Sequence, residues 1–156
     1  MTDHTATSAS ATAAGNSEVI TYRQATPEDA DVIHAILRPY VSNRKLFART
    51  EAEVIELTRH GFIAEVGGRA VGFAAVEVYS RKLAEVQSLA VRAEYQGRGI
   101  GHELVGRCVQ RAKELGVVEV MAISSSDEFL KSCGFDYSLP DAKRALFYQL
   151  QPRSLD

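Results

Sequence analysis

The chain has 156 residues, of which 46% are hydrophobic and 24% are charged, and its formal net charge is −2 at pH 7. This length suffices for one domain with a buried core, and the charge argues against a general nucleic-acid-binding protein. The two cysteines indicate a reduced, cytoplasmic protein rather than a disulfide scaffold. No apolar run approaches the length of a membrane span, and no grouping of Cys, His, Asp and Glu has zinc-like spacing, so no metal site is predicted.

The first segment, residues 1–17, is rich in Thr, Ser and Ala and has no large apolar residue after Met1. It lacks the apolar run of a signal peptide, and we expect it to be a disordered tail. Residues 18–156 are expected to form a single domain. Within it, Ile20 to Gln24 alternates weakly between apolar and polar residues and is predicted to be the first strand.

Two helices are predicted next. The first begins at Thr26-Pro27-Glu28-Asp29, where Thr suits the N-cap, Pro the first helical position and the acids the positive end of the helix dipole. Pro39 is expected to end this helix. The second begins at Thr50-Glu51-Ala52-Glu53, a capping box in which Thr is followed three residues later by Glu, and extends to about Arg59.

Three strands are predicted after the helices. Phe62 to Val66 and Ala70 to Tyr79 are separated by Gly67-Gly68, which is a strong signal for a two-residue hairpin. Leu83 to Val91 is the central strand. Because side chains alternate along a strand, Glu85, Gln87 and Leu89 are expected to share one face.

A glycine-rich turn follows the central strand and opens a helix predicted from Gly99 to Leu115. The turn reads Gln96, Gly97, Arg98, Gly99, Ile100, Gly101, and its glycines allow close approach of a ligand to the backbone. The free N–H groups and the dipole at a helix N-terminus favour a phosphate there. No Gly-Lys pair of a nucleotide-triphosphatase loop is present, and His102 replaces the third glycine of a dinucleotide loop.

The remaining elements complete the predicted fold. Val117 to Ile123 is predicted to be a buried strand, Asp127 to Ser132 a short helix ending at Gly134, and Ala145 to Gln151 the last strand. The order of elements predicts an α+β fold with a mixed central sheet of six to seven strands flanked by about four helices.

The glycine turn after Ser88-Leu89-Ala90-Val91, together with the later Cys133-Gly134-Phe135, resembles motif A and its context in the GNAT acyltransferases. The resemblance covers nearly everything from Val19 to Gln151. It implies the GNAT fold, acetyl-CoA as cosubstrate and direct transfer to an amine in a ternary complex. By the same resemblance, the turn holds the pyrophosphate, with Gln96, Gly97, Arg98, Gly99, Ile100 and Gly101 in contact. The backbone at Leu89 and Val91 would bind the pantetheine arm.

Glu85 is the predicted general base, since family members often carry one in this part of the strand, and partial burial would raise its basicity. An exposed strand carboxylate, or a salt bridge to Lys82 or Arg81, is an equally open alternative. Many GNAT enzymes place a tyrosine acid five residues before the Phe of Gly-Phe, where this chain has Leu130. Ser126 is a candidate for a role near the leaving thiolate, and a purely capping role is its alternative.

The acceptor is predicted from a closer resemblance to the acetyltransferase domain of N-acetylglutamate synthases, in their short stand-alone form. It rests on segments 37–41, 46–50 and 84–91. It implies a small amino acid, glutamate or glutamine, held through its α-carboxylate by Arg49, with Arg38 and Arg44 as alternatives. It also implies a place in amino-acid and arginine biosynthesis. Many synthases have a basic residue where Gln87 lies, so Gln87 is predicted to contact the acceptor and a neutral acceptor stays open.

Other acceptors and another class of function are left open by the sequence. A polyamine or a peptide N-terminus could supply the amine. Alternatively, the protein could bind acyl-CoA as a sensor without catalysis, which the missing tyrosine acid would suit. A homodimer is also left open.

Overall fold

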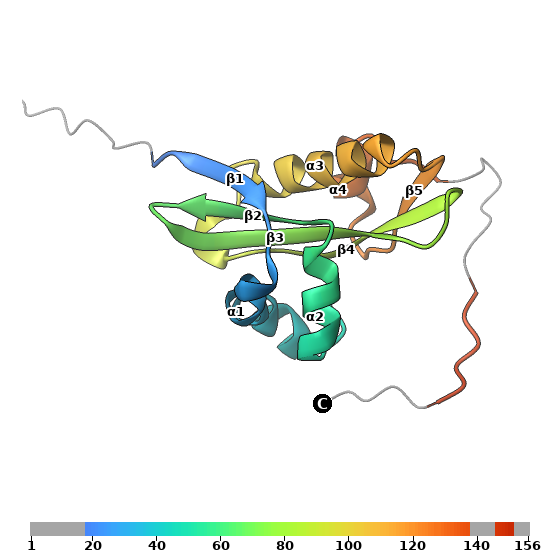
Figure 1. Ribbon diagram of the computed structural model, residues 1–156, viewed down its shortest axis with the longest axis horizontal. Helices are drawn as coiled ribbons and strands as arrows, with labels where there is room; N and C mark the ends of the chain where they lie inside the picture. Colours follow the sequence, from blue (N-terminus) through green and yellow to red (C-terminus); the bar gives the residue numbers. More distant parts are fainter. Residues whose placement is uncertain (1–17, 138–145, 152–156) are drawn as a thin grey trace, which may run out of the picture.

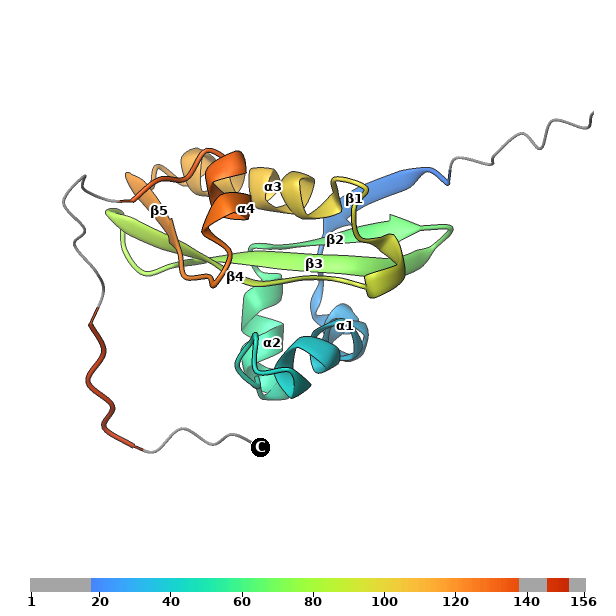
Figure 2. The same ribbon diagram turned by 180° about the vertical axis from the view of Figure 1, so that it is seen from behind.

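The computed structural model describes residues 18–137 and 146–151. Within these residues, five strands form one sheet in the order β1-β2-β3-β4-β5. All neighbouring strands are antiparallel except β4 and β5, which are parallel, so the sheet is mixed, as predicted. The number of strands is smaller than the six to seven predicted. Figures 1 and 2 show α1 and α2 on one face of the sheet and α3 and α4 on the other.

The elements follow one another in nearly the predicted order. They are β1 (Ile20–Gln24), the short 3₁₀ helix η1 (Pro27–Asp29), α1 (Ala30–Ser42), α2 (Glu51–Thr58), β2 (Gly61–Val66), β3 (Arg69–Val78), β4 (Leu83–Val91), η2 (Ala93–Tyr95), α3 (Ile100–Glu114), β5 (Glu119–Ala122) and α4 (Asp127–Ser132).

Two predicted helix starts are confirmed, and one predicted helix end is wrong. The Thr50 hydroxyl accepts a hydrogen bond from the Glu53 N–H at 3.2 Å, and the Glu53 carboxylate accepts one from the Thr50 N–H at 2.7 Å, which is the capping box. η1 begins at Pro27 after the N-cap Thr26. However, Pro39 lies inside α1 rather than ending it. Because Pro39 is near the C-terminus of the helix, it removes one N–H donor there, and the chain still completes the last turn.

Both faces of the sheet are covered by apolar side chains. The cluster on the face of α1 and α2 includes Ile33, Ile63 and Phe73, and the cluster on the face of α3 includes Ile100 and Leu104. Gly72 of β3 allows α3 to approach closely, because a Cβ at this position would lie 3.1 Å from side-chain atoms of both Ile100 and Leu104. The N-terminus of α3 is thereby held against the sheet.

The C-terminal part of the fold differs most from the predictions. β5 covers Glu119–Ala122 rather than 117–123, and its residues are exposed or half-buried rather than buried, because β5 is an edge strand and α4 has no buried residue. Residues 146–151 are exposed and form no strand. The predicted tail 1–17 and the first residue of the predicted last strand, Ala145, lie outside the described residues.

Candidate functional site

β4 and β5 separate halfway along β4. They pair in parallel only from Leu83 opposite Glu119 to Val86 opposite Ala122, whereas β4 continues to Val91. Residues 87–91 therefore have no neighbouring strand on the β5 side within the described chain. Apart from those of Val91, which bond to Tyr40 and Gln96, their backbone groups on that side are open to a ligand that lies along the strand.

A bulge at Ser88 changes which face of the sheet the side chains of β4 occupy. The pairing of β3 with β4 shifts register between Phe73 and Ala75, and Ser88 is buried with a φ of +56°. Before the bulge, Gln87 lies opposite Ala75 of the α1–α2 face. After it, Leu89 packs with the cluster on the α3 face. The prediction that Glu85, Gln87 and Leu89 share one face is therefore wrong, because a bulge inserts one residue into the alternation.

The glycine turn has the geometry of an anion site. Gly97 and Gly99 have φ values of +78° and +80°, which favour glycine. A Cβ built on either would meet nothing within 4 Å, so the space in front of the turn is open. Gly99 is the N-cap of α3, a helix of 15 residues, and the first N–H groups of this helix have no intrahelical acceptor. Backbone donors and the positive end of the helix dipole therefore converge there.

A cavity of about 640 Å³ joins this turn to the free half of β4. Seven residues of the predicted cofactor set line it, together with Ser126: Leu89, Val91, Gln96, Gly97, Gly99, Ile100 and Gly101. Arg98 does not line it, because its guanidinium lies 3.2 Å from the Glu18 carboxylate and over the Tyr95 ring. The backbone donors of the turn suit phosphate groups, and the apolar side chains of Leu89, Val91 and Phe129 suit an apolar remainder of the same ligand.

Tyr40, which the sequence analysis did not select, holds the end of β4. Its hydroxyl donates to the Val91 carbonyl at 2.5 Å and accepts from the Gln96 side-chain amide at 2.7 Å. Gln96 also donates to the Val91 carbonyl at 3.2 Å. The Val91 N–H in turn donates to the Tyr40 hydroxyl at 3.4 Å. Both backbone polar groups of Val91 are thus engaged within the protein, which does not favour the predicted contact of this backbone with the pantetheine arm. Tyr40 lines the cavity. The signal available in the sequence was its place in segment 37–41, which resembles the synthase domain.

Ser126 lies at the N-terminus of α4 and lines the same cavity. Its side chain makes no capping hydrogen bond, so the capping alternative is not realised. Ser124 instead accepts a hydrogen bond from the Ser126 N–H at 2.9 Å, which is ordinary turn chemistry.

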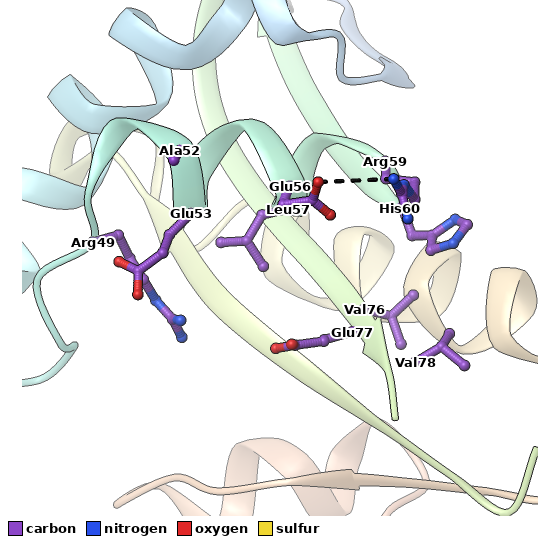
Figure 3. A pocket seen from close by; sticks show the side chains of 10 residues that line it. All are labelled: Arg49, Ala52, Glu53, Glu56, Leu57, Arg59, His60, Val76, Glu77 and Val78. Atoms are coloured by element: carbon purple, nitrogen blue, oxygen red, sulfur yellow. Dashed lines mark ion pairs between the residues drawn. The ribbon is translucent and has the colours of Figure 1, made fainter. Parts of the chain in front are cut away.

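A second cavity, of about 570 Å³, lies on the face of α2 between this helix and the end of β3. Figure 3 shows the Arg49 guanidinium and the Glu53 and Glu77 carboxylates toward one end, and Arg59 and His60 at the other. Glu56 pairs with Arg59 at 3.7 Å. Burial, followed by the neighbouring arginines, lowers the pKa of His60. Apart from the cations of Arg49 and Arg59, the ionised groups of this cavity are therefore carboxylates.

A chain of side-chain hydrogen bonds connects Arg49 with Glu85. Arg49 Nη2 donates to Gln87 Oε1 at 2.7 Å, and Gln87 Nε2 donates to the Tyr79 hydroxyl at 2.7 Å. The Tyr79 hydroxyl donates to Glu85 Oε2, which also accepts from Gln87 Nε2 at 3.2 Å. The structure thus brings together the predicted base and both predicted acceptor residues.

The surroundings of Glu85 and Arg49 separate the alternatives left open by the sequence. Among the described residues, Glu85 forms no ion pair with Arg81 or Lys82, and Arg38 and Arg44 do not line the second cavity. Arg49 Nε is buried and has no hydrogen-bond partner in the described part of the chain. Arginine binds carboxylates through paired N–H donors, and Arg49 lines the second cavity.

Tyr79 was not selected from the sequence, although a signal existed. It lies two residues after Glu77, and Glu77 is opposite Glu85 in the register of β3 and β4, so alternation beyond the end of β3 places its side chain near Glu85. Burial, followed by the hydrogen bond to Glu85, raises the pKa of the Tyr79 hydroxyl.

Two further features were sought in the described residues, namely a membrane-spanning helix and a metal-binding group. Within them, no helix is both long and apolar enough to cross a membrane. The same part of the chain contains no group of three or more His, Cys, Asp and Glu side chains placed to hold a metal ion.

Comparisons with known proteins agree with this geometry. The model of the acetyltransferase (GNAT) family matches residues 29–135. An uncharacterized N-acetyltransferase of Chlorobaculum tepidum is 34% identical over 72% of this chain and 73% of its own length. An amino-acid acetyltransferase of Mycobacterium tuberculosis is 28% identical over 72% of this chain and 66% of its own length, slightly less than two thirds.

One solved structure is similar over most of the described residues. It is N-acetylglutamate synthase from Neisseria gonorrhoeae, complexed with coenzyme A and N-acetyl-glutamate, with a TM-score of 0.68 and 25% sequence identity. The similarity covers 73% of this chain but only 27% of that protein.

Proposed function

The chain belongs to the GNAT acetyltransferase family, an enzyme family that uses acetyl-CoA, and on this premise we propose that it acetylates the α-amine of a small amino acid. The acetyl group passes from acetyl-CoA to the amine by direct attack within a ternary complex. The relatives named amino-acid acetyltransferase and the similarity to N-acetylglutamate synthase with bound coenzyme A support this class of acceptor.

One observation carries the proposal. β4 presents Glu85 and Gln87 on the α2 face, and its free half, beyond the bulge at Ser88, lines the cavity of the glycine turn. The same strand therefore contributes to a proposed donor site on one side and a proposed acceptor site on the other, and β5 pairs with β4 only as far as Val86. Bringing a thioester and an amine together in this way supplies much of the rate acceleration.

The chemistry assigns a task to each part of the site. Arg49 binds the α-carboxylate of the acceptor, and Glu85 takes a proton from its ammonium or attacking amine. The amine nitrogen forms a bond with the acetyl carbon while the carbon–sulfur bond breaks, and coenzyme A leaves as the thiolate. Ser126 lines the donor cavity without a capping bond, so its hydroxyl is placed to stabilise a water or the leaving sulfur.

Glutamate and glutamine are the acceptors that the sequence resemblance favours, and the charges beside Arg49 favour glutamine of the two. Glu77 lies opposite Glu85 on paired strands, and Glu53 and Glu77 line the cavity with Arg49. A second carboxylate on the acceptor would be repelled by these groups, whereas a side-chain amide would not.

The metabolic pathway, the cellular location and the oligomeric state of the protein are also proposals. Acetylation of an amino acid fits a role in amino-acid biosynthesis in the cytoplasm, and in arginine biosynthesis if glutamate is the acceptor. A homodimer stays a prediction.

The proposed function is tested by measuring release of the coenzyme A thiol from acetyl-CoA with glutamate, glutamine, other amino acids, polyamines and a peptide. Glu85→Gln should lower kcat by about 10²–10⁴, and Arg49→Lys should raise the KM of the amino acid, because lysine cannot reproduce the planar fork of arginine. Both variants should bind acetyl-CoA normally. Faster turnover of polyamines or the peptide would refute the amino-acid acceptor, and tight acetyl-CoA binding without any turnover would favour the sensor alternative.

A further inference from the structure

We propose that Tyr79 is a positioning residue, which holds the carboxylate of Glu85 for proton transfer and connects it through Gln87 to the acceptor-binding arginine, Arg49. This inference rests on the proposed function, because it assigns a partner to the base of that reaction. Tyr79 follows β3 and lies beside the site, although it belongs to neither the glycine turn nor β4.

Arg49 determines the direction of every hydrogen bond in this network of side chains. A guanidinium has only donors, so the Gln87 amide must turn its oxygen toward Arg49 and its NH₂ group toward Tyr79. The Tyr79 oxygen accepts from that NH₂ group and therefore directs its own proton at Glu85. An ionised carboxylate can only accept hydrogen bonds. The network is therefore consistent in one arrangement, in which Arg49 donates to Gln87, Gln87 donates to Tyr79, and Tyr79 donates to Glu85.

The network acts on one oxygen of Glu85 and leaves the other available. Oε2 accepts from both Tyr79 and Gln87. Oε1 takes part in no hydrogen bond or ion pair with the described residues that surround it. A carboxylate fixed at one oxygen and free at the other is suited to take a proton in a defined direction.

Tyr79 can serve as a donor throughout the neutral range. Burial, then the hydrogen bond to Glu85, then the charges of Glu85 and Glu77 raise the pKa of its hydroxyl, so the phenol keeps its proton when Glu85 is ionised. The other groups that face Glu85 are Glu77 on β3, which carries a like charge, and Met121 on β5, which carries none. The Tyr79 hydroxyl and the Gln87 amide are therefore the hydrogen-bond donors to Glu85 among the described residues.

The same hydrogen bonds connect the proposed base, Glu85, with the proposed acceptor-binding residue, Arg49. Hydrogen bonds in series polarise one another, and Arg49 is the charged first member of this series. Loss of the Tyr79 hydroxyl removes the route from Gln87 through Tyr79 to Glu85 and leaves only the direct Gln87–Glu85 hydrogen bond of 3.2 Å. Substitutions at the two ends are thus expected to be non-additive in kcat, as for groups that act as a unit.

The test compares Tyr79→Phe with Tyr137→Phe in the full chain. Tyr137 is a matched control because its hydroxyl also donates to a carboxylate, Asp127 Oδ2 at 2.5 Å, on α4. Tyr79→Phe should lower kcat on the order of 10- to 100-fold with little change in the KM of acetyl-CoA. It should also move the acidic limb of the pH profile of kcat/KM to higher pH, because the ionised carboxylate loses a donor. Tyr137→Phe should change neither quantity.

The outcomes distinguish the inference from the proposed function. If the wild-type protein acetylates no amino acid, the proposed function fails before Tyr79 is considered. If the wild type is active, an unchanged kcat or an unmoved acidic limb in Tyr79→Phe overturns the positioning role. A loss of activity that is equal in Tyr79→Phe and Tyr137→Phe would also overturn it. Combining Tyr79→Phe with Arg49→Lys should lower kcat less than the product of the two single effects, and strictly multiplicative effects would refute the connection to Arg49.

Discussion

Ser88 shows how a single residue can divide one strand between two tasks. Its positive φ is unusual for a residue other than glycine, and the bulge that it forms directs Glu85 and Gln87 to the α2 face and Leu89 to the α3 face. Without this inserted residue, the proposed base and the residues proposed to lie beside the pantetheine arm would lie on the same side of the sheet. The bulge therefore separates the proposed acceptor site from the proposed donor site.

Gly99 permits a prediction that separates backbone strain from charge. A Cβ at Gly99 would meet nothing within 4 Å, but its φ of +80° disfavours other residues. Gly99→Ala should therefore destabilise the fold by about 1 kcal/mol and still bind acetyl-CoA. Gly99→Asp should abolish binding, because its carboxylate would repel the phosphates at the helix N-terminus. Calorimetric titration with acetyl-CoA measures both effects.

The hairpin between β2 and β3 supplies the control for that experiment. Gly68 has nearly the same φ, +79°, and equal free space, but it is remote from the turn in sequence and lines neither of the two cavities. Gly68→Asp should be destabilised to a similar extent and bind acetyl-CoA like the wild type. If Gly99→Asp binds as well as Gly68→Asp, the turn is not the phosphate site.

Gln87 is the residue at which acceptor preference should be adjustable. Its side-chain amide now lies between the Arg49 guanidinium and the Tyr79 hydroxyl. Gln87→Lys introduces a cation and should shift kcat/KM from glutamine toward glutamate, because a cation at this site favours a second carboxylate over an amide. The ratio of the two kcat/KM values, in wild type and variant, is the measurement. A ratio that does not move would place the acceptor side chain away from β4.

At the scale of elements, an ion-pair group joins β1 to the start of α1 and to β2. Arg23 of β1 contacts Asp29 at 2.8 Å and Glu65 of β2 at 2.7 Å, and Asp29 is only 12% exposed. The hydrogen bonds from Arg23 are the main cause that lowers the pKa of Asp29. The depressed pKa means that Asp29 stabilises the fold at neutral pH, and this contribution is lost as the pH falls through the folded-state value.

Asp29→Asn tests this contribution. The variant should lose about 1–2 kcal/mol of unfolding free energy at pH 7, and its difference from the wild type should shrink as the pH is lowered from about 5 to 2. Denaturant unfolding over this pH range is the measurement. Asp31→Asn, at an exposed position of α1, is the control and should track the wild type. A difference that grows on acidification would contradict the assignment.

The elements that the sequence predicts well are those with local signals. The capping box at Thr50, the Gly67-Gly68 hairpin and the glycine turn depend on contacts between near neighbours in sequence, so their positions were found. The extent and exposure of β5, and the absence of a strand at residues 146–151, are predicted less well. An apolar run becomes a strand only where a neighbour pairs with it, and pairing is a long-range property. The chain Arg49–Gln87–Tyr79–Glu85 was found in part: three of its members have family precedents, whereas Tyr79 joins them only through the register of β3 and β4.

At the scale of the whole molecule, two helical layers on one sheet place two cavities on different sides of β4. α3, positioned by Gly72, brings the glycine turn to one cavity, and α2, with its capped N-terminus after Arg49, closes the other (Figures 1 and 3). Bulge, strand separation and helix packing are thus parts of one arrangement, in which donor binding and acceptor chemistry depend on different residues.

This separation leads to the last prediction, which concerns global stability. Acetyl-CoA at about 100 times its Kd should add about 2.7 kcal/mol to the unfolding free energy and raise the melting temperature by about 5–10 °C. Glu85→Gln should show the same increase, because Glu85 does not line the donor cavity, whereas Gly99→Asp should show none. Thermal unfolding of the three proteins with and without acetyl-CoA is the measurement. If Glu85→Gln also loses the increase, donor binding reaches across β4 to the α2 face and the two sites are not separable.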